Sequence, residues 1–271
     1  MLTNTLSVGC VYDAVVKYTI GRSFQNEEVR WFNPVVRETS DAYLNDIGGL
    51  HVKEEHVFNA LNSAEGGLVE EGNVGAGTGT RALGFKAGIG TSSRTIAVNG
   101  EEYTVGVLVQ SNFGTGSLVI KGVPVGIELE KGKMDEDGSI MVIIATDVPL
   151  SHRQLKRISK RATLGLTKTG WAAGHGSGDY FIGFSTSSRA EWSNGQKAAH
   201  EKMMKTESNL NVFFQATAEA TEEAILNSFF KAETMEGRDR HVMEEVPIER
   251  IIKILKRYGR FYGLSAWERI Y

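Results

Sequence analysis

The sequence predicts an α/β fold in which helices cover central strands as the layers of a sandwich. Strand-like segments gather in the middle of the chain, where residues 139–146 form an unbroken apolar, β-branched run. Segments whose apolar residues recur at helical spacing lie before and after them, for example at 5–17 and 248–258. Helices on both sides of a sheet bury the apolar face of each element, so a layered α/β sandwich is expected.

The first third of the chain is expected to hold two helices and a glycine-rich region. Residues 5–17 carry valines at helical spacing, and Cys10 falls on the same stripe, so it is expected to be a small buried core residue. A second helix is expected at 51–61, where two glutamates suit the first turn. Residues 66–100 are rich in glycine and are expected to form loops and short strands.

The middle of the chain is expected to form strands on either side of an exposed loop. Residues 104–111 alternate as a strand does, and residues 117–120 are expected to pair with them through the intervening turn. Residues 122–137 are charged and rich in turn residues, which indicates an exposed loop. The run at 139–146 is typical of a strand covered on both faces.

The last part of the chain is expected to be mainly helical. Residues 153–164 predict a basic helix, residues 180–185 a strand, residues 211–217 one more strand and residues 221–232 a helix. A last helix is expected at 248–258, because a proline stands before its apolar stripe and a glycine after it.

Composition argues against several classes of protein. The 271 residues carry a net charge of −3 with acids and bases interspersed, which argues against nucleic acid or an anionic membrane as partner. Four prolines and no Ser/Pro-rich linker favour a single domain over 1–271. The longest apolar run, 140–145, is too short to span a bilayer, and no secretory signal is visible, so a cytoplasmic location is expected.

Motifs for nucleotides and metals are incomplete. The glycines at 75–79 lack the dinucleotide-binding spacing, and residues 84–87 lack the Gly-Lys-Ser/Thr end of a phosphate-binding loop. The six histidines show no metal-ligand spacing, because His51 and His56 fall on different faces of their helix. No metal and no cofactor are predicted.

A Gly-Ser step opens the β-branched run. A serine hydroxyl is a weak nucleophile unless a nearby group accepts its proton. If the bond between Gly138 and Ser139 were cut, Ser139 would gain a free α-amine with a pKa of about 7.7–8.0, suited to act as a base. On the residues alone, an ordinary Gly-Ser turn before a strand is the favoured interpretation of this step.

Short motifs from residue 3 to about residue 240 resemble, in order, one enzyme family. They include Thr3-Asn4-Thr5, Glu38-Thr39, Leu44-Asn45-Asp46-Ile47, Gly77-Thr78-Gly79, Lys86-Ala87-Gly88-Ile89-Gly90-Thr91-Ser92-Ser93-Arg94, Val109-Gln110-Ser111-Asn112-Phe113-Gly114, Gly138-Ser139, Gly176-Ser177-Gly178-Asp179-Tyr180 and Ala220-Thr221-Glu222-Glu223-Ala224. These motifs resemble the autoprocessing L-aminopeptidase/D-amidase/D-esterase and β-peptidyl aminopeptidase family.

The resemblance implies a four-layer αββα sandwich, similar to that of the N-terminal-nucleophile hydrolases. It also implies self-cleavage into residues 1–138 and 139–271. Family members usually carry about a hundred more residues ahead of the first motif, so this chain is expected to lack part of that N-terminal region.

The resemblance further implies roles for individual residues. Ser139 would be the nucleophile, with its own α-amine as the base once the bond after Gly138 is cut. Ser177 and Asp179 would assist by orienting the serine hydroxyl or the amine. The side-chain amide of Asn112 would stabilise the oxyanion that forms on the substrate.

Glu38 matches the acid that receives the free amino group of the substrate. A partly desolvated carboxylate would select for an N-terminal ammonium, because only a cation offsets its desolvation. Without the resemblance, Glu38 would be an ordinary solvated charge. Ser40 stands where family members often carry a bulky residue, so the choice of substrate is not carried over.

The function implied is a self-processing serine aminopeptidase or amidase. It would release N-terminal residues from short peptides, amides or esters with a free N-terminal amine, and it would assemble as a homo-oligomer, a tetramer of processed pairs. Two alternatives stay open. One is an acyltransferase of the ornithine-acetyltransferase-like fold, whose nucleophile is a threonine; the other is an unprocessed, truncated homologue without activity.

Overall fold

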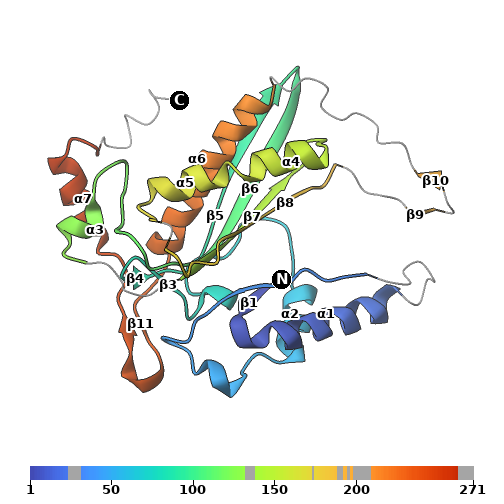
Figure 1. The fold of residues 1–271 in the computed structure, drawn as a ribbon, viewed down its shortest axis with the longest axis horizontal. Coiled ribbons are helices and arrows are strands. Elements are labelled where there is room, and N and C mark those ends of the chain that lie inside the picture. Colours follow the sequence, from blue (N-terminus) through green and yellow to red (C-terminus); the bar gives the residue numbers. More distant parts are fainter. Residues whose placement is uncertain are drawn as a thin grey trace.

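A four-stranded sheet forms the centre of the fold (Figure 1). Its strands lie in the order β5 (Ile89–Val98), β6 (Glu101–Asn112), β7 (Ser139–Thr146) and β8 (Tyr180–Ser185). The first two pairs are antiparallel and β7–β8 is parallel. The computed structural model describes residues 1–23, 32–131, 138–172, 174–187, 192–193, 196–197 and 209–261.

The strand predictions at 139–146 and 180–185 are confirmed, whereas the region at 66–100 is more regular than expected. Residues 89–98 form the long strand β5, and Asn99 and Gly100 join it to β6 with positive φ angles of 54° and 84°. Two such residues between strands are typical of the hairpin turn that matches strand twist. Serine and threonine on the outer face of β5 conceal its alternation in the sequence.

The helix α6 (Leu210–Phe230) lies across β5 and β6 and covers one face of the sheet, beside α4 (His152–Ser159) and α5 (Ala162–Lys168) (Figure 1). A Cβ on Gly90 would stand 2.0 Å from the carbonyl oxygen of Ala224, so glycine allows α6 to approach β5 closely. The structure divides the predicted basic helix at 153–164 into two helices, α4 and α5, which lie on either side of Lys160 and Arg161.

The strand predicted at 211–217 is wrong, because these residues belong to α6. Phe213, Thr217 and Ala220 are fully buried at helical spacing, and the pattern continues into the predicted helix at 221–232. Packing against the sheet thus overrides the strand propensity of the Val-Phe-Phe run.

The opposite side of the molecule is built from the N-terminal residues. Strand β1 (Leu2–Asn4) pairs in parallel with β2 (Arg37–Thr39), which contacts β7, and α1 (Val8–Ser23) packs on α2 (Glu54–Asn62). The layers are thus α4–α6, the four-stranded sheet, β1–β2 and α1–α2, which confirms the αββα order. Within the described residues the second sheet has two short strands.

Cys10 is exposed, so the expectation that it is buried was wrong. The buried stripe of this region passes through Ser7, Val11 and Ala14. Cys10 precedes Val11 by one residue, which turns it by about 100° away from that stripe.

Residues 117–120 do not pair with β6, because β5 and β7 occupy both of its edges. Instead Ile120 forms a bridge with Val123. The expectation of an exposed loop at 122–137 was also wrong where the structure can be described: Val123 and Leu129 are buried on either side of a short helix. Residues 132–137 lie outside the described residues.

The remaining elements lie around this core. The last predicted helix is confirmed as α7, with Ile251 and Leu255 buried. No helix in the described part of the chain is long and apolar enough to cross a membrane. The other elements are α3 (Val125–Glu128), α7 (Ile248–Arg257), β3 (Arg81–Ala82), β4 (Phe85–Lys86), β9 (Trp192–Ser193), β10 (Gln196–Lys197), β11 (Met235–Glu236) and β12 (Val242–Met243).

Candidate active site

The end of β6 and the start of β7 bring two of the predicted site residues together. Asn112, the last residue of β6, is the cross-strand partner of Ser139, the first residue of β7. Directly opposed residues of an antiparallel pair have Cβ atoms about 4.5–5.5 Å apart. The pairing of β6 with β7 therefore holds the hydroxyl of Ser139 beside the amide of Asn112.

The turn before β8 supplies the next two residues. The backbone N–H of Gly178 donates to Oγ of Ser139 at 3.1 Å. Oδ1 of Asp179 accepts from Oγ of Ser177 at 2.9 Å and from the backbone N–H of Ile140 at 3.2 Å. Because Ser139 Oγ accepts the bond from Gly178, its own proton remains available for donation to a base.

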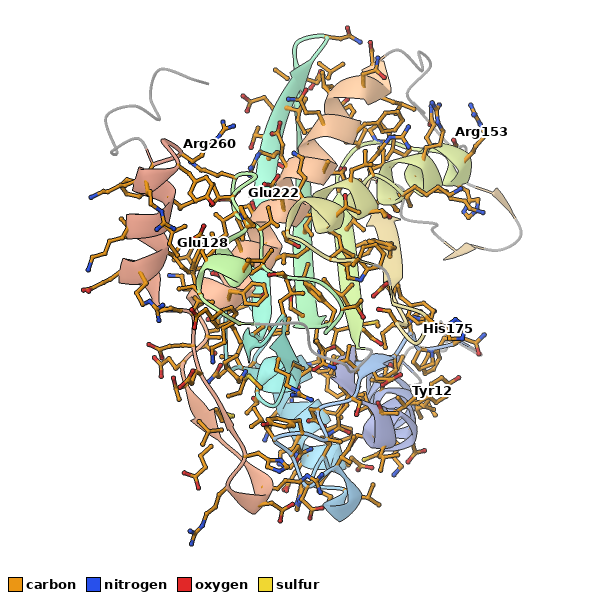
Figure 2. All side chains as sticks on the ribbon, turned by 60° about the vertical axis from the view of Figure 1, so that its left-hand side comes forward. Tyr12, Glu128, Arg153, His175, Glu222 and Arg260 are labelled. Atoms are coloured by element: carbon orange, nitrogen blue, oxygen red, sulfur yellow. The ribbon has the colours of Figure 1, made fainter. Side chains whose placement is uncertain are left out.

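The carboxyl group of Asp179 is partly buried. Burial raises its pKa above the ordinary value for aspartate, while the hydrogen bonds from Ser177 and Ile140 act in the opposite direction. Figure 2 shows His175, which leads into this turn, toward the end of the molecule that also holds Tyr12 of α1. The site thus lies where the central sheet meets the N-terminal layers.

The side chain of Asn112 is fixed at both of its ends. Nδ2 donates to the carbonyl of Ser40 at 2.7 Å, and Oδ1 accepts from the backbone N–H of Arg81 at 3.2 Å. An amide has two N–H groups, and the bond to Ser40 uses one of them. A donor held this firmly suits the stabilisation of an oxyanion, because it need not reorganise during reaction.

The residue before Ser139 has no room for a side chain. A Cβ on Gly138 would stand 2.2 Å from the carbonyl oxygen of Asn112 and 2.7 Å from Cα of Phe113. Glycine therefore lets the backbone before Ser139 pass directly over the end of β6.

A cavity of about 530 Å³ opens in front of Ser139. Its lining combines the serine and the asparagine with basic and aromatic side chains. The lining residues are Ser40, Ala42, Tyr43, Arg81, Asn112, Phe113, Gly114, Gly138, Ser139, Gly176, Arg238 and His241.

Three of these residues form a stack that the sequence did not reveal. The guanidinium of Arg81 lies 3.6 Å from the ring centre of Tyr43, and that ring stacks on His241 at 4.6 Å with an interplanar angle of 17°. They come from β3, from the segment after β2 and from the turn between β11 and β12. No motif or spacing links them, so the sequence offered no signal for their contact.

Glu38 does not line this cavity. It is half-buried on β2, where its carboxylate accepts a hydrogen bond from the hydroxyl of Thr5. Glu38 stands two residues before Ser40, which does line the cavity. Glu38 therefore lies beside the cavity and outside its wall.

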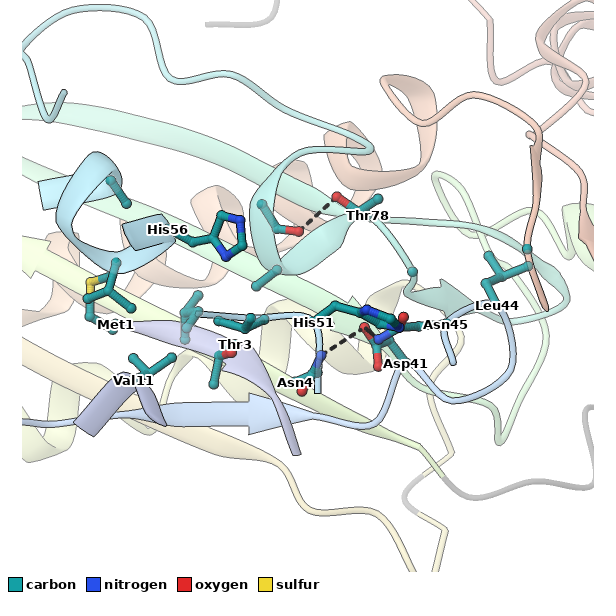
Figure 3. Close-up of a pocket in the computed structure, with 18 of the residues that line it drawn as sticks. Met1, Thr3, Asn4, Val11, Asp41, Leu44, Asn45, His51, His56 and Thr78 are labelled. Carbon is teal, nitrogen blue, oxygen red and sulfur yellow. Dashed lines mark hydrogen bonds between the residues drawn. The ribbon is translucent and has the colours of Figure 1, made fainter. Parts of the chain in front are cut away.

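A second cavity, of about 500 Å³, lies among β1, α1 and α2 (Figure 3). Asp41 lines it with only 9 % of its surface exposed, and its Oδ2 accepts from Nδ2 of Asn4 at 3.4 Å and of Asn45 at 3.0 Å. Its Oδ1 has no hydrogen-bond partner among the described residues. Burial raises the pKa of Asp41. Ser139 does not line this cavity.

Within the described ranges, no group of three or more His, Cys, Asp or Glu side chains is placed to hold a metal ion.

Comparison with known proteins finds relatives that are named as aminopeptidases. Two curated relatives are named β-peptidyl aminopeptidase BapA. The protein from Sphingosinicella microcystinivorans is 42% identical over 96% of this chain and 69% of its own length. The protein from Sphingosinicella xenopeptidilytica is 38% identical over 94% of this chain and 67% of its own length.

Solved structures share the fold. The L-aminopeptidase D-Ala-esterase/amidase of Ochrobactrum anthropi matches with a TM-score of 0.90 and 38% identity, over 96% of this chain and 74% of that one. It is described as a prototype for the serine aminopeptidases and a new variant among the Ntn hydrolase fold. A β-aminopeptidase of Burkholderia sp. matches with a TM-score of 0.85 and 39% identity, over 95% and 73% of the two chains.

The family model described as Peptidase family S58 matches residues 1–243. This match covers most of the chain, and the relatives and the shared N-terminal-nucleophile fold agree with it. The chain belongs to Peptidase family S58 and is a hydrolase of that family.

Proposed function

We propose that this protein is a self-processing serine aminopeptidase or amidase that releases N-terminal residues from short peptides, amides or esters. The observation that carries the proposal is the position of Ser139 Oγ. It lies at the first residue of a strand, across from the fixed amide of Asn112 and within hydrogen-bond distance of the Gly178 N–H. The aminopeptidase names of the relatives support it.

Maturation would begin with Ser139 acting on its own chain. Oγ attacks the carbonyl carbon of Gly138, the C–N bond to Ser139 breaks, and the acyl group passes from nitrogen to oxygen as an ester. Water then hydrolyses the ester, which leaves a carboxylate on Gly138 and a free α-amine on Ser139. The absence of a side chain at residue 138 supports this step, because the backbone there can lie against Asn112 and Phe113.

The new α-amine would then serve as base in turnover. It takes the proton of Oγ while Oγ attacks the substrate carbonyl, and Nδ2 of Asn112 stabilises the oxyanion. The protonated amine then gives its proton to the leaving amine or alcohol. Water hydrolyses the resulting ester on Ser139 and regenerates the hydroxyl.

Ser177 and Asp179 would act by positioning rather than by attack. Asp179 accepts from the N–H of Ile140, the residue directly after the new amine, and it also holds the hydroxyl of Ser177. This pair fixes the start of β7 against the turn before β8. The reacting groups on Ser139 are thereby kept in one geometry.

Glu38 would bind the ammonium of the substrate at the edge of the cavity. Its half-buried carboxylate next to Ser40 supports that role, since an ammonium offsets the desolvation of such a group. Assembly of matured chains into a homo-oligomer belongs to the same proposal. Tyr12 and Ile20 of α1 expose apolar side chains that such an interface would cover.

The first test is the intact mass of the purified chain under denaturing conditions. Two fragments, one beginning at Ser139, are expected for the wild type and a single chain for Ser139→Ala. The same preparations are then assayed with aminoacyl p-nitroanilides. An uncut wild-type chain whose hydrolysis does not exceed that of Ser139→Ala would contradict the proposal.

A further inference from the structure

Lys86 is a lysine that the fold buries completely. It stands on β4, and none of its surface is exposed to solvent. Burial disfavours the charged ammonium and lowers the pKa of Lys86 to about 7. Lysine is almost never fully buried unless it has polar partners, so the contacts of this side chain indicate its task. The proposed mechanism does not yet use it.

The partners of Lys86 are two backbone carbonyls that face each other. Its Nζ donates to the oxygen of Gly77 at 3.1 Å and to that of Ala87 at 2.5 Å. The hydroxyl of Thr80 lies 3.0 Å from each of the same two oxygens. A Cβ on Gly77 would stand 2.5 Å from the backbone nitrogen of Ile89, so the two segments pass very close together. Lys86 and Thr80, which we call the Lys86 clamp, therefore hold the segment before β3 against the segment after β4.

The Lys86 clamp closes a hairpin that supports the amide of Asn112. Strands β3 and β4 form this hairpin at the end of the central sheet, and Arg81 is the direct partner of Lys86 in it (Figure 1). The backbone N–H of Arg81 donates to Oδ1 of Asn112 at 3.2 Å. A single strand pair thus links the clamp to the donor that orients Asn112.

Two further hydrogen bonds attach the hairpin to the end of β6. The N–H of Leu83 donates to the carbonyl of Phe113 at 2.9 Å, and the N–H of Ser111 donates to the carbonyl of Gly88 at 3.0 Å. Ser111 and Phe113 are the two neighbours of Asn112 in the chain. Since Gly88 directly follows the second carbonyl that the clamp holds, a loosened clamp would loosen this attachment as well.

We propose that Lys86 is a positioning residue for the reaction at Ser139: by closing the β3–β4 hairpin it keeps the side-chain amide of Asn112 in the orientation that stabilises the oxyanion. The inference rests on the proposed function, in which Nδ2 of Asn112 performs that task. Lys86 acts through Asn112 and not on the substrate, because it is fully buried and does not line the Ser139 cavity. A misplacement of about 1 Å in such a group can cost about a hundredfold in rate.

The test is a double-mutant cycle on matured protein, with alanine p-nitroanilide as substrate. Lys86→Met removes the ammonium and keeps a long, unbranched side chain in its place. We expect kcat to fall by about ten- to hundredfold and KM to stay within about threefold of the wild type, since the amide acts on the transition state. In the Asn112→Ala background the same change should lower kcat by less than about threefold, because the amide that Lys86 positions is already gone.

Two threonine variants separate positioning from a general loss of packing. Thr80→Val removes the second donor of the clamp with little change of shape, and it should lower kcat by about three- to tenfold, the effect of one neutral hydrogen bond. Thr217→Val is the matched control, because this fully buried hydroxyl donates to the carbonyl of Phe213 within α6. It should lose a similar amount of stability in denaturant unfolding and keep its kcat. If Lys86→Met yields no folded, matured chain, the cycle is run with Thr80→Val and Asn112→Ala, and the same criteria apply.

Failure of this inference can be separated from failure of the proposed function. A kcat of Lys86→Met close to that of the wild type, or a loss equally large in the Asn112→Ala background, overturns the positioning role alone. Equal losses of kcat in Thr80→Val and Thr217→Val overturn it too, because any buried hydroxyl would then have the same effect. A wild-type chain that stays uncut and is no more active than Ser139→Ala overturns the proposed function, and the positioning role with it.

Discussion

The two cavities have similar volumes, about 530 and 500 Å³, but very different walls. The Ser139 cavity is formed where strand ends meet loops, and it is lined by a serine, a fixed amide and basic side chains. The Asp41 cavity has a mainly apolar surface, formed in part by side chains of β1, α1 and α2, and it holds one buried carboxyl group whose second oxygen lacks a partner among the described residues.

The volume of a cavity therefore does not identify the reactive site. A nucleophile needs a donor and a positioning group within hydrogen-bond distance, and only the cavity at the end of β6 offers these around Ser139. The Asp41 cavity presents an acid that holds Asn4 and Asn45 together, which is a structural task. Paired substitutions, one in each cavity, can test this division.

The largest expected effect comes from Ser139→Ala. Loss of the nucleophile should prevent chain cleavage and lower kcat/KM by at least about a thousandfold. Its counterpart is Val57→Ala, which removes buried methyl groups beside the Asp41 cavity. That variant should lose about 1–2 kcal/mol of stability, at about 0.8 kcal/mol per buried carbon, and keep its activity within threefold. A loss of activity in Val57→Ala comparable to that of Ser139→Ala would abolish the distinction between the cavities.

The second largest loss of activity is expected for Asn112→Ala. Removal of one oxyanion donor lowers kcat by about 10²–10³, and the same variant also frees the carbonyl of Ser40 that the amide now holds. Thr78→Ala removes a polar side chain from the wall of the other cavity and should leave kcat unchanged. Steady-state kinetics on one aminoacyl p-nitroanilide compares the two; equal kcat values for both variants would remove Asn112 from the proposed mechanism.

Glycine substitutions probe the close packing at each cavity. A Cβ on Gly138 would meet a backbone oxygen at 2.2 Å, and a Cβ on Gly79 would meet Cβ of Asp41 at 2.9 Å. Both alanine variants should lose about 1–3 kcal/mol of stability in denaturant unfolding, as overpacked sites do. Only Gly138→Ala should also slow chain cleavage, followed by mass over time. Gly66→Ala, whose Cβ would meet nothing within 4 Å, is the control and should change neither quantity.

The smallest effect concerns pH. Burial raises the pKa of both Asp179 and Asp41, so the folded chain holds these protons more tightly than the unfolded chain. Their contribution to stability is fully present below the unfolded carboxyl pKa, about 3.9, and is lost as the pH rises through the folded values. Asp179→Asn and Asp41→Asn should each flatten this decline in Tm.

Asp13→Asn serves as the control, because Asp13 is exposed with 64% of its side chain accessible. Thermal unfolding from about pH 4 to neutral pH gives the three slopes in comparison with the wild type. A slope for Asp179→Asn identical to that of Asp13→Asn would show that burial does not perturb the Asp179 carboxyl group. Only Asp179→Asn should also lower activity.

Much of the fold follows from the sequence where local pattern and tertiary packing agree. The β-branched run gives β7 with its predicted bounds, and the residues suggested by short motifs around Ser139, Ser177 and Asn112 lie together. The first half of α6 was misassigned, because burial against the sheet, rather than propensity, makes it helical. The contact of Arg81, Tyr43 and His241 was not predictable, since it depends on how three segments that are distant in the sequence meet.

The four-stranded sheet has one further consequence. The proposed cut before Ser139 would leave β5 and β6 in one fragment and β7, β8 and α6 in the other, while α6 still packs across β5 and β6. The folded pair would stay together, because each fragment supplies half of a single sheet. Once the fragments have dissociated on heating, however, they would have to reassociate by diffusion. Recovery of the native state would then become a second-order reaction that depends on protein concentration, as it does for a heterodimer.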